Sequence, residues 1–189
     1  MSTTGRTVVI DPNQTWAPLE KRLADERDPI LRRNLEAVIA HQKAEAHGDL
    51  DALMATLAPE PLYRLGAPDN PRLHPRGTEG VRAYYSAFVA SGATQLVHDI
   101  DRLAVDRHLI LTDGTIRIAY PGATLAAMGI EVADPAADAF YLYEARMAIV
   151  WVIDDEGRIV GEESYTDRDG FAGIAERRLA PDDIAALRA

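Results

Sequence analysis

Apolar residues in the first half of the chain recur with a helical period. Between residues 30 and 47 they fall about 100° apart around a helix axis, on one stripe that contains Leu31, Leu35, Val38 and Ile39 and, as a polar member, Gln42. Gly48 ends this predicted helix, and Asp49 is a suitable N-cap for a second, short helix over 49–57. Thr78 and Gly80 open a third predicted helix over 78–88.

Beyond residue 92 the period changes from 3.6 to 2, which is typical of strands that are buried on one face. Four strands are predicted over 94–105, 108–120, 139–153 and 158–166, after a short one over 61–65. The acidic turn from Asp154 to Gly157 predicts a hairpin between the last two. Three helices followed by an antiparallel meander predict an α+β fold, in which a curved sheet wraps around the helices as a cone-shaped barrel.

The ends of the chain and one long connection lie outside this pattern. Residues 1–29 are expected to be an N-terminal extension, fixed to the domain at 30–169 by the indole of Trp16. Residues 170–189 are expected to be a C-terminal tail with a helix over 181–188. The connection 121–138 is rich in Ala, Gly and Pro, which predicts either a lid or a small helical excursion.

Strand parity predicts which side chains face the inside of the cone. In 139–153 one parity carries Glu144 and Arg146, so the charge-free parity should face the core. That set contains Tyr141, Tyr143, Ala145, Met147, Ile149 and Trp151. The charged parity should lie on the convex face, where Glu144 and Arg146 would suit a symmetric dimer interface.

The same reasoning places a histidine among apolar residues. In 108–120 the inward set includes Thr112, Gly114 and Ile116, whereas in 94–105 it includes His98, with Asp99 and Asp101 outside. A second polar pair lies on the first predicted helix. His41 and Glu45 are four residues apart at the edge of its apolar stripe, so they can form a hydrogen bond and titrate near neutrality.

Composition excludes several classes of function. The 189 residues include no cysteine, which excludes thiol nucleophiles, disulfides and thiolate metal sites. A net charge of −10 argues against nucleic-acid binding. We find no metal-ligand spacing and none of the common cofactor motifs, so we expect neither a metal nor a cofactor. The absence of a leader-like or membrane-spanning run predicts a cytoplasmic protein without membrane contact.

Three stretches of the sequence resemble a known superfamily. These are His47-Gly-Asp-Leu-Asp-Ala-Leu-Met-Ala-Thr-Leu-Ala, Gly77-Thr-Glu-Gly-Val-Arg-Ala-Tyr-Tyr, and Gly157-Arg-Ile-Val with the later Tyr165-Thr-Asp. Over about residues 30–169 the chain resembles the nuclear transport factor two-like superfamily, in its SnoaL-like branch. That branch includes polyketide cyclases, ketosteroid isomerase, limonene epoxide hydrolase and scytalone dehydratase. The resemblance implies the cone-shaped fold, but its motifs are typical of the fold more than of a reaction.

The resemblance also argues against two of the reactions known in this branch. The two catalytic carboxylates of ketosteroid isomerase correspond to Leu65 and Ile149, so its mechanism is not expected. The Asp-Arg-Asp set of limonene epoxide hydrolase is also missing; its positions correspond to Gly114, Ile116 and Ser164.

The dehydratases give the closest match. Their strand histidine corresponds to His98, and their first-helix tyrosine to His41. The helix aspartate of the bile-acid type corresponds to Ala46, with Glu45 next to it.

These observations predict a cofactor-free lyase or isomerase that works by general acid–base chemistry on a bulky, apolar polycyclic or aryl molecule. Dehydration, isomerisation, retro-aldol cleavage or deformylation, and cyclisation all fit. The candidate catalytic residues are His98, His41, Glu45 and Tyr63. The candidate substrate-binding residues are Tyr84, Tyr141, Tyr143, Met147, Trp151, Ile116, Thr112 and Glu162. The alternative is a non-catalytic binding protein or scaffold; in either case we expect a homo-oligomer, a dimer or a trimer.

Overall fold

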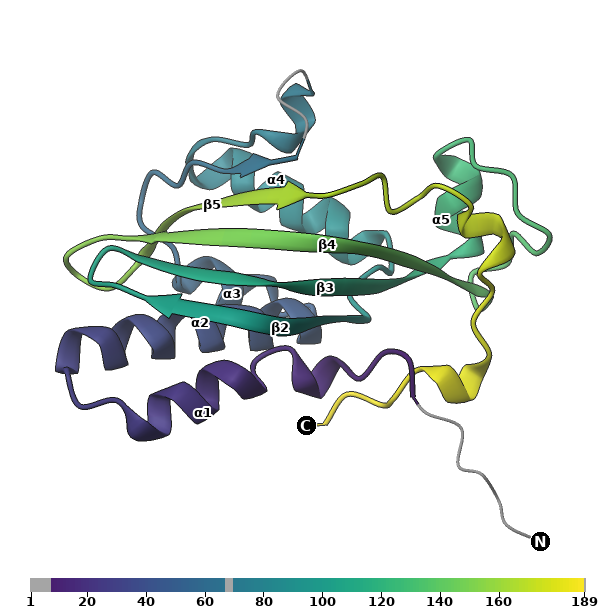
Figure 1. Ribbon diagram of the computed structural model, residues 1–189. Helices are drawn as coiled ribbons and strands as arrows, with labels where there is room; N and C mark the ends of the chain where they lie inside the picture. The colour runs from purple at the N-terminus through teal and green to yellow at the C-terminus, as the bar shows by residue number, and fades with distance from the viewer. Residues whose placement is uncertain (1–7, 67–69, 189) are drawn as a thin grey trace, which may run out of the picture.

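The computed structural model describes residues 8–66 and 70–188. Its five strands form one curved, unclosed sheet in the order β1-β5-β4-β3-β2, and three helices cover one face of it (Figure 1). The α+β prediction is therefore confirmed. The elements are α1 (Ala17–Asp25), α2 (Pro29–His47), α3 (Leu50–Ala55), β1 (Arg64–Leu65), α4 (Gly77–Ala90), β2 (Leu96–Val105), β3 (Leu109–Pro121), α5 (Gly122–Ala127), β4 (Phe140–Ile153) and β5 (Ile159–Thr166).

Local capping explains where the two central helices begin and end. Asp28 caps α2 by accepting a hydrogen bond of 2.8 Å from the amide of Ile30. Gly48 ends α2 with a φ of 65°, a left-handed conformation that favours glycine. The next residue, Asp49, caps α3 through the amide of Ala52 at 3.0 Å. The turn therefore directs α2 and α3 onto the same face of the sheet.

The sheet curves where β2 crosses close to β3. β2 has an irregular register between Ile100 and Arg102, opposite Gly114. A Cβ atom at Gly114 would lie 1.9 Å from the carbonyl oxygen of Asp99. Only a glycine lets the two backbones come this close, so Gly114 permits the bend that makes the covered face concave.

The predicted strand parity is confirmed. Tyr141, Ala145 and Trp151 are almost fully buried between β4 and the helices. On the convex face, Arg146 pairs with Asp113 at 2.6 Å and with Asp101 at 2.8 Å. Its neighbour there, Glu144, pairs with Arg117 at 2.7 Å.

The ends of the chain pack together more closely than predicted. Trp16 is buried as expected, and the following residues form α1, which the sequence analysis did not anticipate. The connection 121–138 contains the small helix α5, one of its two predicted forms. The helix predicted over 181–188 is wrong, because only Pro181–Asp183 forms a 3-10 turn.

The C-terminal segment instead pairs with the N-terminal arm. The amide of Ala185 donates to the carbonyl of Ile10 at 2.8 Å, and the amide of Arg188 donates to the side-chain oxygen of Asn13 at 2.9 Å. These partners take the backbone amides that a helix would otherwise use internally. The two ends of the described chain therefore lie side by side (Figure 1).

Candidate functional site

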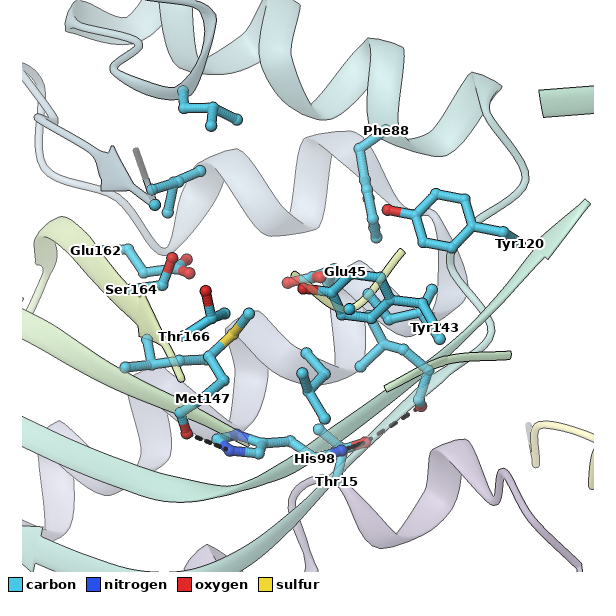
Figure 2. Close-up of a pocket in the computed structure, with 18 of the residues that line it drawn as sticks. Thr15, Glu45, Phe88, His98, Tyr120, Tyr143, Met147, Glu162, Ser164 and Thr166 are labelled. Carbon is cyan, nitrogen blue, oxygen red and sulfur yellow. Dashed lines mark hydrogen bonds between the residues drawn. The ribbon is translucent and has the colours of Figure 1, made fainter. Parts of the chain in front are cut away.

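A cavity of about 360 Å³ lies between the concave face of the sheet and helices α2 and α4. This size suits a drug-sized organic molecule. Eight of the twelve predicted site residues line it: His98, Glu45, Tyr84, Tyr143, Met147, Trp151, Ile116 and Glu162. Figure 2 shows the histidine, the two carboxyl groups and several hydroxyl groups around one space. The wall is mainly apolar, so these polar groups act in a medium of low polarity.

His98 lies on β2 with only 1% of its surface exposed. Its Nε2 is 3.2 Å from the carbonyl oxygen of Met147 on β4, and a carbonyl only accepts, so Nε2 carries the hydrogen (Figure 2). Nδ1 therefore holds a lone pair, and it is buried without a hydrogen-bond partner in the part of the chain that the structure describes. Burial lowers the pKa of His98, while the Met147 carbonyl and then Asp113 oppose that shift. The ring is thus neutral at neutral pH and has a free basic nitrogen.

Two carboxyl groups face the same cavity from opposite walls, Glu45 from α2 and Glu162 from β5. Burial raises the pKa of Glu45 to about 7. Burial and, second, the charge of Glu45 raise the pKa of Glu162 to about 8. Within the part of the chain that the structure describes, no ion pair to either carboxyl is found. At neutral pH the pair therefore carries at least one proton.

Aromatic rings and hydroxyl groups complete the cavity wall. Tyr143 and Tyr120 pack edge-on against Phe171, with ring centres 4.9 Å and 5.0 Å from it. Ser164 and Thr166 point inward from β5 beside Glu162 (Figure 2). Flat apolar surfaces with a few hydroxyl groups suit a ring system that carries oxygen substituents.

The structure places His41 in the core, away from the cavity wall. Its Nδ1 lies 2.8 Å from the hydroxyl of Thr56, and its Nε2 lies 2.9 Å from the hydroxyl of Tyr85. Both ring nitrogens are therefore engaged, and the predicted bond to Glu45 does not form. Burial lowers the pKa of His41 to about 3, so the prediction that it titrates near neutrality is wrong.

Three further predicted site residues also lie behind the cavity wall. The hydroxyl of Tyr63 contacts that of Tyr85 at 3.3 Å. Tyr141 contacts the backbone of Asp134, with its hydroxyl 2.9 Å from the amide. Thr112 accepts a hydrogen bond of 3.3 Å from the indole of Trp151. All three hydroxyl groups hold the core together, and none is among the cavity-lining residues.

Sequence reasoning missed several residues of the cavity wall. Gln42 lies on α2 with a buried side-chain oxygen that has no partner, and Thr15 reaches the wall from the N-terminal arm. Gln42 was already placed on the apolar stripe of α2, where a polar residue could have indicated a polar function. Thr15 gives no such signal, because only the folded arm brings it next to β2, where it contacts the amide of His98 at 3.4 Å.

Two other kinds of site are absent from the described part of the chain. No group of three or more His, Cys, Asp or Glu side chains in residues 8–66 and 70–188 is arranged to hold a metal ion. In that same part of the chain, no helix has the length and apolar character needed to cross a membrane.

Solved structures with this fold share little sequence with the chain. A protein from Shewanella putrefaciens CN-32, provisionally described as a SnoaL-like polyketide cyclase, is 9% identical with a TM-score of 0.63, over 84% of this chain and 94% of its own. One from Shewanella denitrificans OS-217 with the same description is 12% identical with a TM-score of 0.59, over 76% and 96%. TerC, co-crystallised with polyporic acid, is 12% identical with a TM-score of 0.55, over 76% and 98%.

At these identities the solved structures show the fold alone. Comparison with curated proteins gives no significant match. The model of the SnoaL-like domain, in contrast, matches residues 38–162. This match includes the C-terminal half of α2, the paired carboxyl groups and His98, and it spans well over half of the sequence. The chain therefore belongs to the SnoaL-like domain family.

Proposed function

We propose that the protein is a cofactor-free lyase or isomerase that moves protons on a bulky, largely apolar small molecule. One observation carries the proposal: His98, whose Nδ1 has no hydrogen-bond partner among the described residues, and two carboxyl groups line a single apolar cavity. The base of such a reaction needs a lone pair at neutral pH, and the acid needs a proton. His98 Nδ1 offers the first and Glu162 the second.

Dehydration illustrates how these residues would act. His98 Nδ1 takes a proton from a carbon of the substrate, and the electrons of that C–H bond form a double bond. The neighbouring C–O bond breaks, and Glu162 supplies the proton with which the hydroxyl group leaves as water. The carboxylates of Asp113 and Asp99 on the convex face favour the imidazolium ion that results. Isomerisation, retro-aldol cleavage and cyclisation use the same two proton transfers in a different order.

The cavity suggests the chemical class of the substrate. Aromatic rings of Phe88, Tyr120 and Tyr143 suit a flat ring system. The unpartnered oxygen of Gln42 and the lone pair of His98 suit hydroxyl groups on it, while the protonated carboxyl groups suit carbonyl oxygens. Polycyclic and aryl compounds with hydroxyl and carbonyl groups are therefore the first to test, together with polyporic acid, the ligand with which TerC was co-crystallised.

The experiment has two stages. Thermal-shift screening with steroid, polyketide and lignin-type aryl compounds identifies ligands, and mass spectrometry then detects turnover. We expect His98→Gln to lower turnover at least about a hundredfold. His108→Gln is the matched control, because His108 is exposed at the β2–β3 turn.

A loss below about threefold for His98→Gln would contradict the role of His98. Ligand binding without any turnover would instead favour the alternative, a non-catalytic binding protein. Homo-oligomer formation remains a prediction. Glu144 and Arg146 have partners in their own chain, so a dimer would have to rest on other residues of the convex face.

A further inference from the structure

A line of buried hydrogen bonds leads from Glu162 away from the cavity. Its members are the side chains of Glu162, Tyr85, His41 and Thr56, which we call the His41 relay. Tyr85 and His41 are 2% and 0% exposed, so water does not compete for their hydrogen bonds. The two rings pack edge to face, and Trp151 packs against the other side of His41 at 5.4 Å. Packing therefore fixes the geometry of the line.

The direction of its first bond follows from two oxygen atoms. The hydroxyl of Thr56 lies 2.7 Å from the carbonyl oxygen of Leu53. Oxygens this close need a hydrogen between them, and the carbonyl has none to give, so the hydrogen of Thr56 points to Leu53. The hydroxyl oxygen of Thr56 then accepts from its other partner, and His41 Nδ1 donates to it across 2.8 Å.

The rest of the line follows from the neutral state of His41. A neutral imidazole with its hydrogen on Nδ1 has a lone pair on Nε2. The hydroxyl of Tyr85 lies 2.9 Å from this nitrogen and must donate to it. That hydroxyl has one hydrogen, so its oxygen can only accept from its remaining neighbours, Tyr63 at 3.3 Å and Glu162 Oε2 at 3.4 Å.

We infer that the His41 relay holds Glu162 as a protonated acid, because the hydroxyl of Tyr85 has no hydrogen left to give to an ionised carboxylate. His41 is thus a positioning residue that acts through Tyr85, and it does not touch the substrate. The inference rests on the proposed function, in which Glu162 supplies a proton, and it explains why this residue and not Glu45 is the acid.

The other groups around Glu162 also favour its protonated form. Glu45 faces it from α2, Tyr84 and Tyr85 from α4, and Tyr63 from the segment before β1. An ionised Glu45 disfavours a second negative charge beside it. Burial raises the pKa of Tyr63, Tyr84 and Tyr85, so these hydroxyl groups stay neutral.

The test measures the position of the ring hydrogen of His41 and the pKa of Glu162 in the protein without substrate. Nitrogen-15 NMR of the histidine side chains reports which ring nitrogen of His41 carries the hydrogen. Carbon-13 NMR of the glutamate carboxyl groups, assigned with Glu162→Gln, gives the pKa of Glu162. In the unaltered protein we expect hydrogen on Nδ1 at pH 7 and a carboxyl that is still mostly protonated.

The informative variant is Thr56→Val, which lies outside the cavity wall and removes the acceptor of Nδ1. His41 should then carry its hydrogen on Nε2, Tyr85 should donate to Glu162, and the pKa of Glu162 should fall by about one unit. Thr56→Ser keeps the hydroxyl group and should change neither signal. Thermal unfolding of both variants checks that they are folded.

Hydrogen on Nε2 in the unaltered protein would overturn the inference, and this measurement does not depend on any variant. An unchanged pKa of Glu162 in a folded Thr56→Val variant would also overturn it. Turnover separates this inference from the proposed function. If the relay is found as described but Glu162→Gln retains full activity on a substrate, the proposed function fails and the relay stands.

Discussion

Carboxyl groups on the two sides of the sheet have pKa values that are shifted in opposite directions. On the convex face, Asp113 lies against Arg146, and their hydrogen bond lowers the pKa of Asp113. On the concave side, Glu45 and Glu162 form no ion pair with another described residue, and burial raises the pKa of both. Carboxyl groups on opposite sides of the same sheet therefore have opposite acid–base properties. Strand parity, more than residue type, decides whether a carboxyl group here stabilises the fold or is available for chemistry.

The largest effect on stability is expected at Gly114, which permits the bend that makes one face of the sheet concave. In Gly114→Ala the new methyl group would collide with the backbone of Asp99, which cannot move without disrupting the β2–β3 pairing. We expect a loss of about 3 kcal/mol in the free energy of unfolding. Urea denaturation measures it, with Thr115→Val as the control on the opposite face. Equal stability of the two variants would contradict the role given to Gly114.

A smaller effect should distinguish Glu162 from its neighbour Glu163. The folded protein keeps a proton on Glu162 up to about pH 8, whereas the unfolded chain releases it near its ordinary pKa of 4.5. The folded state thus holds more protons between these values, and stability falls as pH rises through this window. Glu162→Gln removes that loss. From pH 5 to pH 9, the melting temperature of this variant should therefore fall by about 2–5 °C less than that of the unaltered protein.

Glu163→Gln is the matched control for this measurement. Glu163 points to the other face of β5 and pairs with Arg64 at 2.6 Å. Its replacement should therefore not reproduce the gain in melting temperature at high pH. If both variants behaved alike, the contrast between the two faces would be lost.

The smallest effect is expected for the charges of the convex face. Arg146→Met removes the pairs with Asp113 and Asp101, but Arg102 remains near Asp113 at 3.2 Å. Because these groups are partly exposed to solvent, we expect only a small loss of stability at low salt, well below that of Gly114→Ala. At about 1 M salt the difference should become smaller, since screening weakens the original pairs. A loss that does not depend on salt would show that Arg146 acts through packing of its carbon chain.

Strand parity was sufficient to predict the inward position of His98, because a period of two leaves only two choices. Helix periodicity was less informative for His41 and Glu45. Four residues turn a helix by about 400°, so the two side chains differ by about 40° in direction. That difference is enough to point His41 at Tyr85 in the core while Glu45 faces the cavity.

Other features depended on contacts between distant parts of the chain. The partners of His41 lie just after α3 and on α4, and no local pattern shows that Thr56 and Tyr85 both contact this histidine. The C-terminal residues were predicted as a helix from their composition, but their amides bind the N-terminal arm instead. Tertiary competition for the same backbone groups decided this outcome, and it is not visible in a single segment.

The family match ends at residue 162, yet the cavity does not. Thr15 belongs to the N-terminal arm, and Arg168 and Phe171 lie beyond the match, but all three line the cavity. A fragment limited to 38–162 would lack these parts of the cavity wall. The flanking segments therefore complete the cavity, and a ligand that fills it would also contact residues outside the shared domain.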